Sequence, residues 1–247
     1  TGGGQIQGLA AVIVKNKIQS VLAGRNGRIR VKPQSQGCCT ACFNLIDLKD
    51  IGIFKQIDME VSSIHFDQHI LDTLGYDFTE QTILEPCVGG GHMVAGIQKY
   101  LDENNQTPAQ CYGTDFKDRG FRSTKWALQY GMDTLSDDYP IDKADVVIMN
   151  PPYATIEPFL IRALEIAQDK LIVLCRTQVL EGAGRYDKIF KDNPPTDIYQ
   201  YIDRIQCWKG GTKPTGSSAQ AYCWLVWDKK APAAAPKLHW IHRSKEY

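Results

Sequence analysis

The chain has 247 residues, of which 43% are hydrophobic and 23% are charged. This length and composition suffice for one large α/β domain or two small ones, and they exclude a disordered chain. No apolar run reaches the roughly 18 residues of a membrane-spanning helix, and no signal peptide opens the sequence, so we expect a cytoplasmic protein. The eight cysteines are spread along the chain, several within apolar runs, which indicates reduced, buried thiols.

Positive charge is concentrated near the beginning of the sequence. Basic and acidic residues are equal in number, 28 of each, so the net charge is zero. This balance does not favour a nonspecific polyanion binder. Residues 1–46, however, contain six Lys or Arg and no Asp or Glu. This segment either faces phosphate groups or forms a solvated, weakly ordered leader.

The sequence divides into three regions. Residues 1–57 form a basic N-terminal extension, rich in Gly and Gln, whose fold the sequence does not indicate. Residues 58–230 alternate strand-like and helix-like segments, which predicts a mostly parallel sheet with helices on both faces. Residues 231–247 form a C-terminal tail that begins with a short, stiff linker of Pro and Ala.

The central region contains the expected secondary structure. The predicted strands are the apolar runs 82–84, 110–114, 144–149 and 171–175. The predicted helices are the segments 65–74, 93–101, 123–129 and 156–168. Segments 198–208 and 221–227 predict an antiparallel hairpin around a long loop of small residues.

A glycine cluster follows the first strand of this region. Residues 84–93 read LEPCVGGGHM, which predicts a strand, a tight turn and a helix. Glycine permits positive φ and a close approach of backbone to ligand, and open α/β sheets bind nucleosides at this carboxyl edge. The position three residues after Gly91 is Val94 rather than glycine, which weakens a dinucleotide-binding interpretation. A nucleoside site and a simple tight turn both remain open.

Two aspartates follow at positions where a nucleoside would be bound. Asp115 ends the next expected strand, where a carboxylate can accept hydrogen bonds from both hydroxyls of a ribose. The alternative is that Asp115 caps a helix. Asp133 precedes the strand at 144–149 and can accept from an adenine amino group, although aspartates are also common in turns.

The most specific motif is Asn150-Pro151-Pro152-Tyr153, directly after an expected buried strand. The prolines fix the backbone and remove two N–H donors, which leaves carbonyl groups facing a pocket. The Asn150 amide oxygen and the Pro151 carbonyl can together accept both hydrogens of a planar amino group. This draws the nitrogen towards a tetrahedral form and frees its lone pair for attack. Tyr153 is placed to stack on the ring that carries the amine.

Two further patterns are weaker. Cys39-x-x-Cys42 and His65-x-x-x-His69 could together bind zinc, but the intervening 22 residues exceed the finger spacing of about 12. Cys87 could act as a nucleophile, but no histidine–acid pair accompanies it, so a packed thiol is favoured. We therefore expect no metal.

The glycine turn and the tetrapeptide together resemble motifs of a known enzyme group. The EPCVGGG sequence at 85–91 and NPPY at 150–153 are similar to motifs I and IV of the S-adenosylmethionine-dependent amino-methyltransferases, and most similar to their N6-adenine DNA branch. The similarity extends over about residues 64–242. Further stretches that resemble phage and prophage members are 115–120, 176–182, 185–186, 190–195, 204–205 and 223–228.

This resemblance implies a class I, Rossmann-like methyltransferase fold, with a mostly parallel seven-stranded sheet and an antiparallel C-terminal hairpin. It implies S-adenosyl-L-methionine as the cofactor, with its ribose at Asp115 and its adenine at Asp133. The loop implied to hold the methionine part contains Glu85, Pro86, Cys87, Gly89 and Gly91. The residues implied to take the target amine are Asn150, which also borders the cofactor, Pro151, Pro152 and Tyr153. No metal is required, because the sulfonium donor is already activated.

The resemblance further implies DNA as the partner, with a target adenine flipped out of the duplex, in a phage or restriction-modification setting in the bacterial cytoplasm. An RNA base amine, a protein glutamine and a non-catalytic cofactor-binding protein are the alternatives. No recognition domain is evident outside the catalytic region, so the N-terminal extension, the loop at 209–220 or a partner subunit would have to read the target. Arg119 and Arg176 either contact DNA phosphates or pair with acidic side chains.

Overall fold

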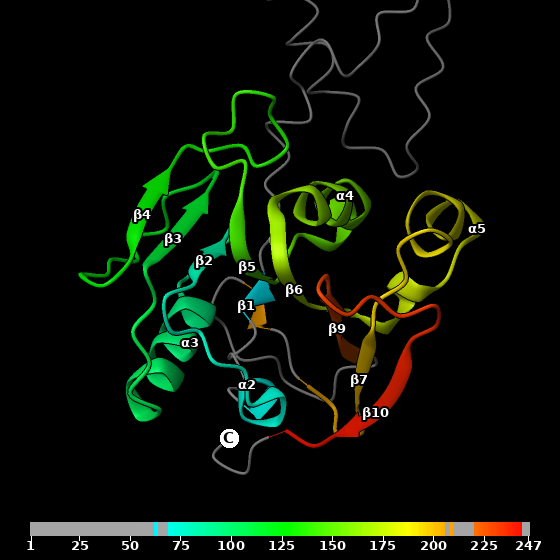
Figure 1. Cartoon of the computed structure of the whole chain (residues 1–247). Coiled ribbons are helices and arrows are strands. Elements are labelled where there is room, and N and C mark those ends of the chain that lie inside the picture. Colours follow the sequence, from blue (N-terminus) through cyan, green and yellow to red (C-terminus); the bar gives the residue numbers. More distant parts are fainter. Residues whose placement is uncertain (1–61, 64–68, 206–207, 210–219, 244–247) are drawn as a thin grey trace, which may run out of the picture. The chain divides into compact units, whose positions relative to one another are not determined.

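The computed structural model describes residues 62–63, 69–205, 208–209 and 220–243 (Figure 1). All of them belong to the unit Asp58–Tyr247. The predicted N-terminal extension lies outside the described residues, and so do Cys39, Cys42 and His65 of the weak zinc pattern. Within the described ranges, no helix has the length and apolar character needed to cross a membrane.

A sheet of eight strands, in the order β10-β7-β9-β6-β5-β2-β3-β4, forms the centre of this unit. The strands are β2 (Thr82–Glu85), β3 (Gln110–Asp115), β4 (Ala127–Tyr130), β5 (Ala144–Met149), β6 (Ala167–Arg176), β7 (Asp197–Tyr201), β9 (Tyr222–Asp228) and β10 (Lys237–Ile241). Neighbouring strands are parallel, except that β9 is antiparallel to both β6 and β7. The predicted mostly parallel sheet with an antiparallel C-terminal hairpin is confirmed, with eight strands rather than seven.

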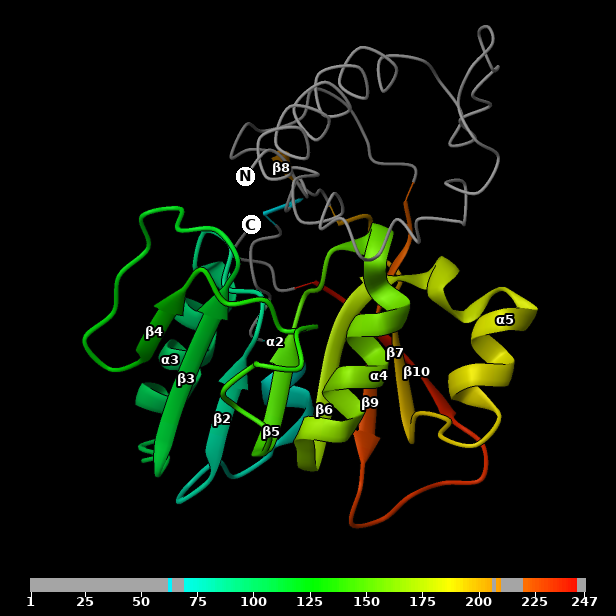
Figure 2. The same ribbon diagram turned by 90° about the horizontal axis from the view of Figure 1, so that it is seen from above.

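Helices lie on both faces of the sheet (Figures 1 and 2). One face carries α2 (His69–Leu74) and α3 (His92–Glu103), and the other carries α4 (Ile156–Ile166) and α5 (Ala183–Arg185). A π-helical turn, Tyr186–Phe190, continues α5, and short 3-10 turns precede α4 (Tyr153–Thr155) and follow β6 (Thr177–Leu180).

The apolar run of β5 shows why the sequence folds in this way. Val146 and Ile148 belong to the core cluster beneath α3, whereas Val147 and Met149 belong to the cluster beneath α4. All four side chains are fully buried. A strand covered on both faces needs apolar residues at consecutive positions, so the run is continuous rather than alternating.

The prediction of a helix at 123–129 is wrong, because β4 begins at Ala127 and pairs in parallel with β3. The exposure of the four β4 residues alternates along the chain, as in a strand at the edge of a sheet. Trp126 anchors the segment: its side chain is buried in the core, and its indole Nε1 donates to Oε1 of Gln98 on α3 at 3.1 Å. Tertiary packing here overrides the local propensity of a four-residue segment.

The segment expected as a C-terminal tail contributes β10, which pairs in parallel with β7 at the edge of the sheet. Ile241 is buried, and the His239 ring stacks on Tyr199 with 4.6 Å between centroids and hydrogen bonds to Oδ1 of Asp197. The predicted strand at 198–208 is also shorter than expected. It ends at Tyr201, and β8 (Trp208–Lys209) pairs instead with β1 (Ser62–Ser63).

Candidate active site

Four adjacent parallel strands bring the predicted site residues to one edge of the sheet. β2 ends at Glu85, β3 at Asp115, and β6 at Arg176, while Asn150 directly follows β5. The strands lie in the order β6-β5-β2-β3, so their carboxyl ends meet at the same edge. The connections leave in opposite directions from β2 and β5, which makes this the switch point where open α/β sheets bind ligands.

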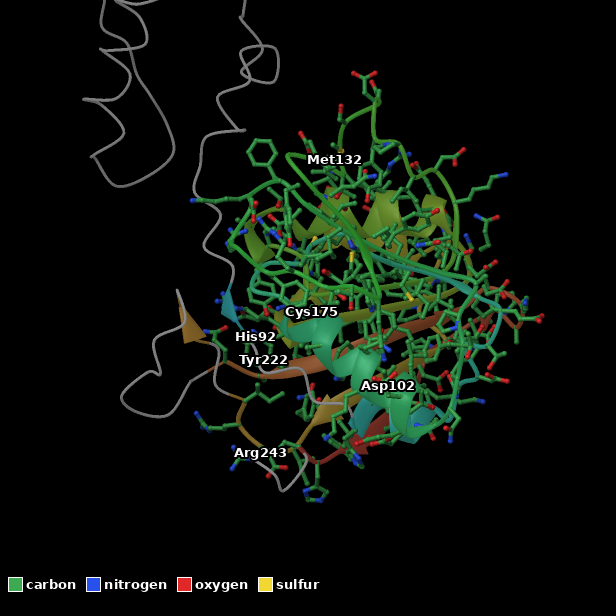
Figure 3. The ribbon with its side chains drawn as sticks, turned by 90° about the vertical axis from the view of Figure 1, so that its left-hand side faces the viewer. His92, Asp102, Met132, Cys175, Tyr222 and Arg243 are labelled. Carbon is green, nitrogen blue, oxygen red and sulfur yellow. The ribbon has the colours of Figure 1, made fainter. Side chains whose placement is uncertain are left out.

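The glycine turn joins β2 to α3 at this edge. Gly89 and Gly91 have φ values of 55° and 83°, a conformation that favours glycine. A Cβ atom at Gly91 would lie 2.1 Å from Cδ2 of Phe121, so no side chain fits there. Figure 3 shows His92 at the end of α3 that begins at this turn and Asp102 towards the opposite end. The turn therefore exposes backbone rather than side chains at Gly89 and Gly91, and the Phe121 ring packs against Gly91.

The Glu85 carboxyl group lies fully buried beneath this turn. Its Oε1 accepts a 3.0 Å hydrogen bond from the Cys87 backbone N–H, whereas Oε2 has no hydrogen-bond partner among the described residues. Burial, and secondarily the Asp115 charge, raise the pKa of Glu85 well above its usual value. Buried polar atoms are normally paired, so the absence of a partner for Oε2 among the described residues makes this atom a candidate contact for a ligand.

Asp115 ties the glycine turn to the loop that follows β3. Its Oδ2 accepts from the Gly89 N–H at 2.8 Å, and its Oδ1 accepts from Lys117 N at 2.7 Å and from Arg119 Nη1 at 3.0 Å. A carboxylate has about four acceptor positions, which leaves one on Oδ2. Arg119 thus pairs with an acidic side chain, one of the two alternatives that the sequence left open. No helix follows Asp115 directly, so it does not act as a helix cap.

The turn containing Asp133 packs beside the glycine turn. Met132 N donates to the Asp115 carbonyl at 3.2 Å, and Thr134 Oγ1 donates to the Pro86 carbonyl at 3.1 Å. The Asp133 carboxylate accepts from Leu135 N at 3.1 Å. The structure therefore brings this turn to the site, and the Asp133 side chain also has the local turn contact that is common for aspartate.

The surroundings of the Cys87 thiol disfavour its thiolate form. Burial, with the nearby carboxyl groups of Glu85 and Asp115, raises its pKa well above the usual value. The reactive form of cysteine is the thiolate, so this environment opposes a nucleophilic role.

The tetrapeptide at 150–153 connects β5 to α4. The Tyr153 hydroxyl donates a 3.0 Å hydrogen bond to Oδ1 of Asn150. Pro151 is buried, and the backbone N–H of Thr155 donates to the Pro152 carbonyl at 3.1 Å, which closes the turn. Asn150 and Tyr153 are both partly exposed at the sheet edge.

Two residues outside the tetrapeptide border Tyr153. The guanidinium carbon of Arg176 lies 4.6 Å from the centroid of the Tyr153 ring, and the Tyr222 ring is 6.0 Å away at 51°. Arg176 and Tyr222 face each other across the β6–β9 pair. Tyr222 gave no signal in the sequence, because its position depends on the register between strands about 45 residues apart in the chain.

Comparisons with known proteins bear on the fold. No protein-family model matches the chain, and neither does any curated protein. Among solved structures, a type I restriction-modification methyltransferase subunit from Streptococcus thermophilus aligns with a TM-score of 0.52 and 16% identity, covering 80% of this chain and 50% of its own. A modification subunit assigned to a type I restriction enzyme of Vibrio vulnificus YJ016 aligns with a TM-score of 0.53 and 12% identity, covering 81% of this chain and 51% of its own.

A protein from Listeria monocytogenes assigned as a class I S-adenosylmethionine-dependent methyltransferase aligns with a TM-score of 0.52 and 15% identity, covering 72% of this chain and 63% of its own. The chain thus spans between half and two thirds of the length of these structures. At such identities, the likeness concerns the fold. The chain has the class I S-adenosylmethionine-dependent methyltransferase fold.

Proposed function

We propose that this protein transfers a methyl group from S-adenosyl-L-methionine to the exocyclic N6 amine of adenine in DNA. The observation that carries the proposal is the position of Asn150, Pro151 and Tyr153. They follow β5 at the sheet edge that also holds the glycine turn and the buried Glu85. Fold alone does not define function, so the proposal depends on these residues.

The residues around the glycine turn fit this cofactor. Oε2 of Glu85, which has no partner in the part of the chain that the structure describes, suits an ammonium group, and Gly89 and Gly91 leave the backbone open to a close approach. Asp115 retains one acceptor position on Oδ2 for a ribose hydroxyl. A second ribose hydroxyl could bind there only if Arg119 moved from Oδ1. When bound, S-adenosylmethionine supplies a methyl group already activated on a sulfonium sulfur.

Asn150 would hold the reacting amine. Its Oδ1 has two lone pairs, one of which accepts from the Tyr153 hydroxyl. The other would accept one amine hydrogen, and the Pro151 carbonyl would accept the second. The amine lone pair would then be free and directed by two fixed acceptors, so catalysis is mainly positioning. After transfer, the methylated nitrogen would lose one proton to solvent.

Tyr153 would stack on the target base. A base within a duplex must first be flipped out, at a cost on the order of a few kcal/mol. DNA as the substrate, and a partner subunit that reads its sequence, are both suggested by the restriction-modification subunits with the same fold. The N-terminal extension is the other candidate for reading the target.

The test is transfer of radiolabelled methyl from S-adenosylmethionine to DNA, RNA and protein offered side by side. The proposal predicts label in DNA, recovered as N6-methyladenine after digestion to nucleosides. Label confined to RNA or to protein glutamine would keep the active site but overturn the substrate. Cofactor binding without any labelled product would favour a non-catalytic binder.

A further inference from the structure

The guanidinium of Arg176 lies over the ring of Tyr153, the residue proposed to stack on the target base. Arg176 ends β6 at the site edge and is half-buried. Its Nε is buried and has no hydrogen-bond partner among the described residues. A buried donor without a partner is uncommon in a folded protein and calls for an explanation.

Apart from the cation–π contact with Tyr153, the charge of Arg176 has no partner among the described residues. Within the part of the chain that the structure describes, no carboxylate forms an ion pair with it, whereas Arg119 pairs with Asp115 and Arg122 with Asp118. Partly buried cations are ordinarily paired with anions. A guanidinium held in the wall of a binding site without an anion therefore suits an anionic group of the ligand.

The backbone around Arg176 is held in place. Thr177 N donates to the Ala221 carbonyl at 3.0 Å, which extends the β6–β9 pairing beyond Arg176. Arg185 donates from its Nε to the Val179 carbonyl at 2.8 Å and so fixes the turn that follows β6. The backbone that carries Arg176 is thus held by rigid elements, as expected of a group that positions a ligand.

We infer that Arg176 is a target-positioning residue that binds a phosphate group of the nucleotide whose base stacks on Tyr153. This inference rests on the proposed function and narrows its substrate to a nucleotide, since a glutamine side chain offers no anion. A phosphate is favoured over a ring nitrogen of adenine, because only the anion compensates the charge of the guanidinium. Arg and phosphate match in geometry as well as in charge.

The primary test compares the affinities of deoxyadenosine and of its 5′- and 3′-monophosphates, measured by calorimetry with S-adenosylhomocysteine saturating the cofactor site. We expect the wild-type protein to bind one monophosphate roughly tenfold or more tightly than the nucleoside, as for a charge-assisted hydrogen bond. Arg176→Gln should remove this difference, and Arg176→Lys should retain part of it. Thermal unfolding of each variant shows whether it folds.

Arg122→Gln is the matched control. It removes the same charge from a guanidinium whose two hydrogen bonds to Asp118 are both exposed. This variant should keep the preference for the monophosphate. Equal binding of nucleoside and monophosphate by the wild type, a preference that survives in Arg176→Gln, or no nucleotide binding at all would each overturn the inference. Equal weakening of nucleoside and monophosphate in Arg176→Gln would indicate a ring contact and would also overturn it.

A kinetic test uses the DNA fragment that the wild type methylates. Arg176→Gln should raise KM for DNA roughly tenfold or more while kcat changes little, because the phosphate contact exists in both ground and transition states. The slope of log KM against log salt should fall by roughly 0.7 to 0.9. A loss confined to kcat, with an unchanged salt slope, would contradict a phosphate contact. Absence of transfer by the wild type would instead count against the proposed function, and the nucleotide-binding test would still decide the role of Arg176.

Discussion

The Tyr153 hydroxyl donates a 3.0 Å hydrogen bond to Oδ1 of Asn150, the atom proposed to accept the target amine. This contact orients the amide before any substrate arrives, and it leaves one lone pair of Oδ1 for the amine. The Tyr153 ring is itself covered on one face by the guanidinium of Arg176. The Tyr153 side chain thus contacts both the Asn150 amide and the Arg176 guanidinium.

The two parts of Tyr153 can be separated by substitution. Tyr153→Phe keeps the ring but loses the hydrogen bond to Asn150, so we expect kcat to fall by roughly tenfold, equivalent to about one neutral hydrogen bond. Tyr153→Ala also removes the stacking surface, worth about 1–3 kcal/mol per base, and should in addition raise KM for DNA. Steady-state kinetics with labelled S-adenosylmethionine measures both constants. Equal effects of the two substitutions on KM would contradict the stacking role.

We expect the buried Glu85 to lower the stability of the cofactor-free protein at neutral pH and to strengthen cofactor binding. Its pKa is raised in the folded protein, so the unfolded chain releases a proton that the folded chain keeps. The stability contributed by this group is therefore present below the usual pKa of 4.5 and is lost as pH rises towards the folded value. Glutamine does not ionise, so Glu85→Gln does not lose this stability at higher pH. Without cofactor, the variant should therefore melt at a higher temperature than wild type, and the difference should grow as pH rises.

The same Glu85→Gln substitution should weaken binding of S-adenosylhomocysteine by roughly ten- to a hundredfold, because a charged hydrogen bond to the ligand's ammonium group is lost. Calorimetry at pH 7.5 measures the affinity, and melting curves between pH 5 and pH 9 measure the stability difference. Asp102→Asn, on the exposed end of α3, is the control for removing a carboxylate. Unchanged affinity in Glu85→Gln would exclude Glu85 from the cofactor site.

Alanine substitutions at Gly91 and Gly120 can separate the cost of backbone strain from the cost of a steric clash. Both have positive φ, 83° and 85°, but a Cβ at Gly91 meets the Phe121 ring, whereas at Gly120 nothing lies within 4 Å. Gly120→Ala should cost about 1–2 kcal/mol of stability from φ alone. Gly91→Ala should cost a further 1–3 kcal/mol or so from overpacking and should weaken cofactor binding.

Denaturant unfolding measures both costs. Adding Phe121→Ala to Gly91→Ala should restore the stability lost through overpacking but not the stability lost through the positive φ. If Gly91→Ala and Gly120→Ala proved equally stable, the close packing of Phe121 on the glycine turn would be contradicted.

Cys87 should be dispensable for transfer. Its raised pKa keeps the thiol protonated at neutral pH, and its contact to Glu85 is made by the backbone N–H, which Cys87→Ala retains. We expect kcat to remain within a few-fold of wild type. Alkylation of this thiol by iodoacetamide should be slow at pH 7.5 and should accelerate only in strongly alkaline solution. Complete loss of transfer in Cys87→Ala, with cofactor binding intact, would reopen a nucleophilic role.

The sequence predicts much of the strand–turn–helix region because its signals are local. The run ending in Met149 is apolar at consecutive positions, and Gly91 requires a conformation that only glycine tolerates without strain. Motifs placed directly after such strands meet at one sheet edge by topology alone. The expected positions of Glu85, Asp115 and Asn150 follow from that rule.

Contacts that depend on register or on packing across the chain could not be predicted. Tyr222 reaches the site because β9 pairs antiparallel with β6, opposite Arg176. The side chain of Trp126 is buried in the core, and the segment after it forms an edge strand where the sequence predicted a helix. That Oε2 of Glu85 and Nε of Arg176 have no hydrogen-bond partner among the described residues can be found only from the three-dimensional structure.

The role of Asn150 in DNA methylation can be tested by digesting DNA treated with wild type or with Asn150→Ala and measuring N6-methyladenine by mass spectrometry. We expect N6-methyladenine with wild type and none above background with Asn150→Ala, while both proteins bind S-adenosylhomocysteine with nearly equal affinity. Methylation of DNA by Asn150→Ala at the wild-type rate, or a parallel loss of cofactor binding in that variant, would contradict the proposed role of Asn150 in holding the target amine.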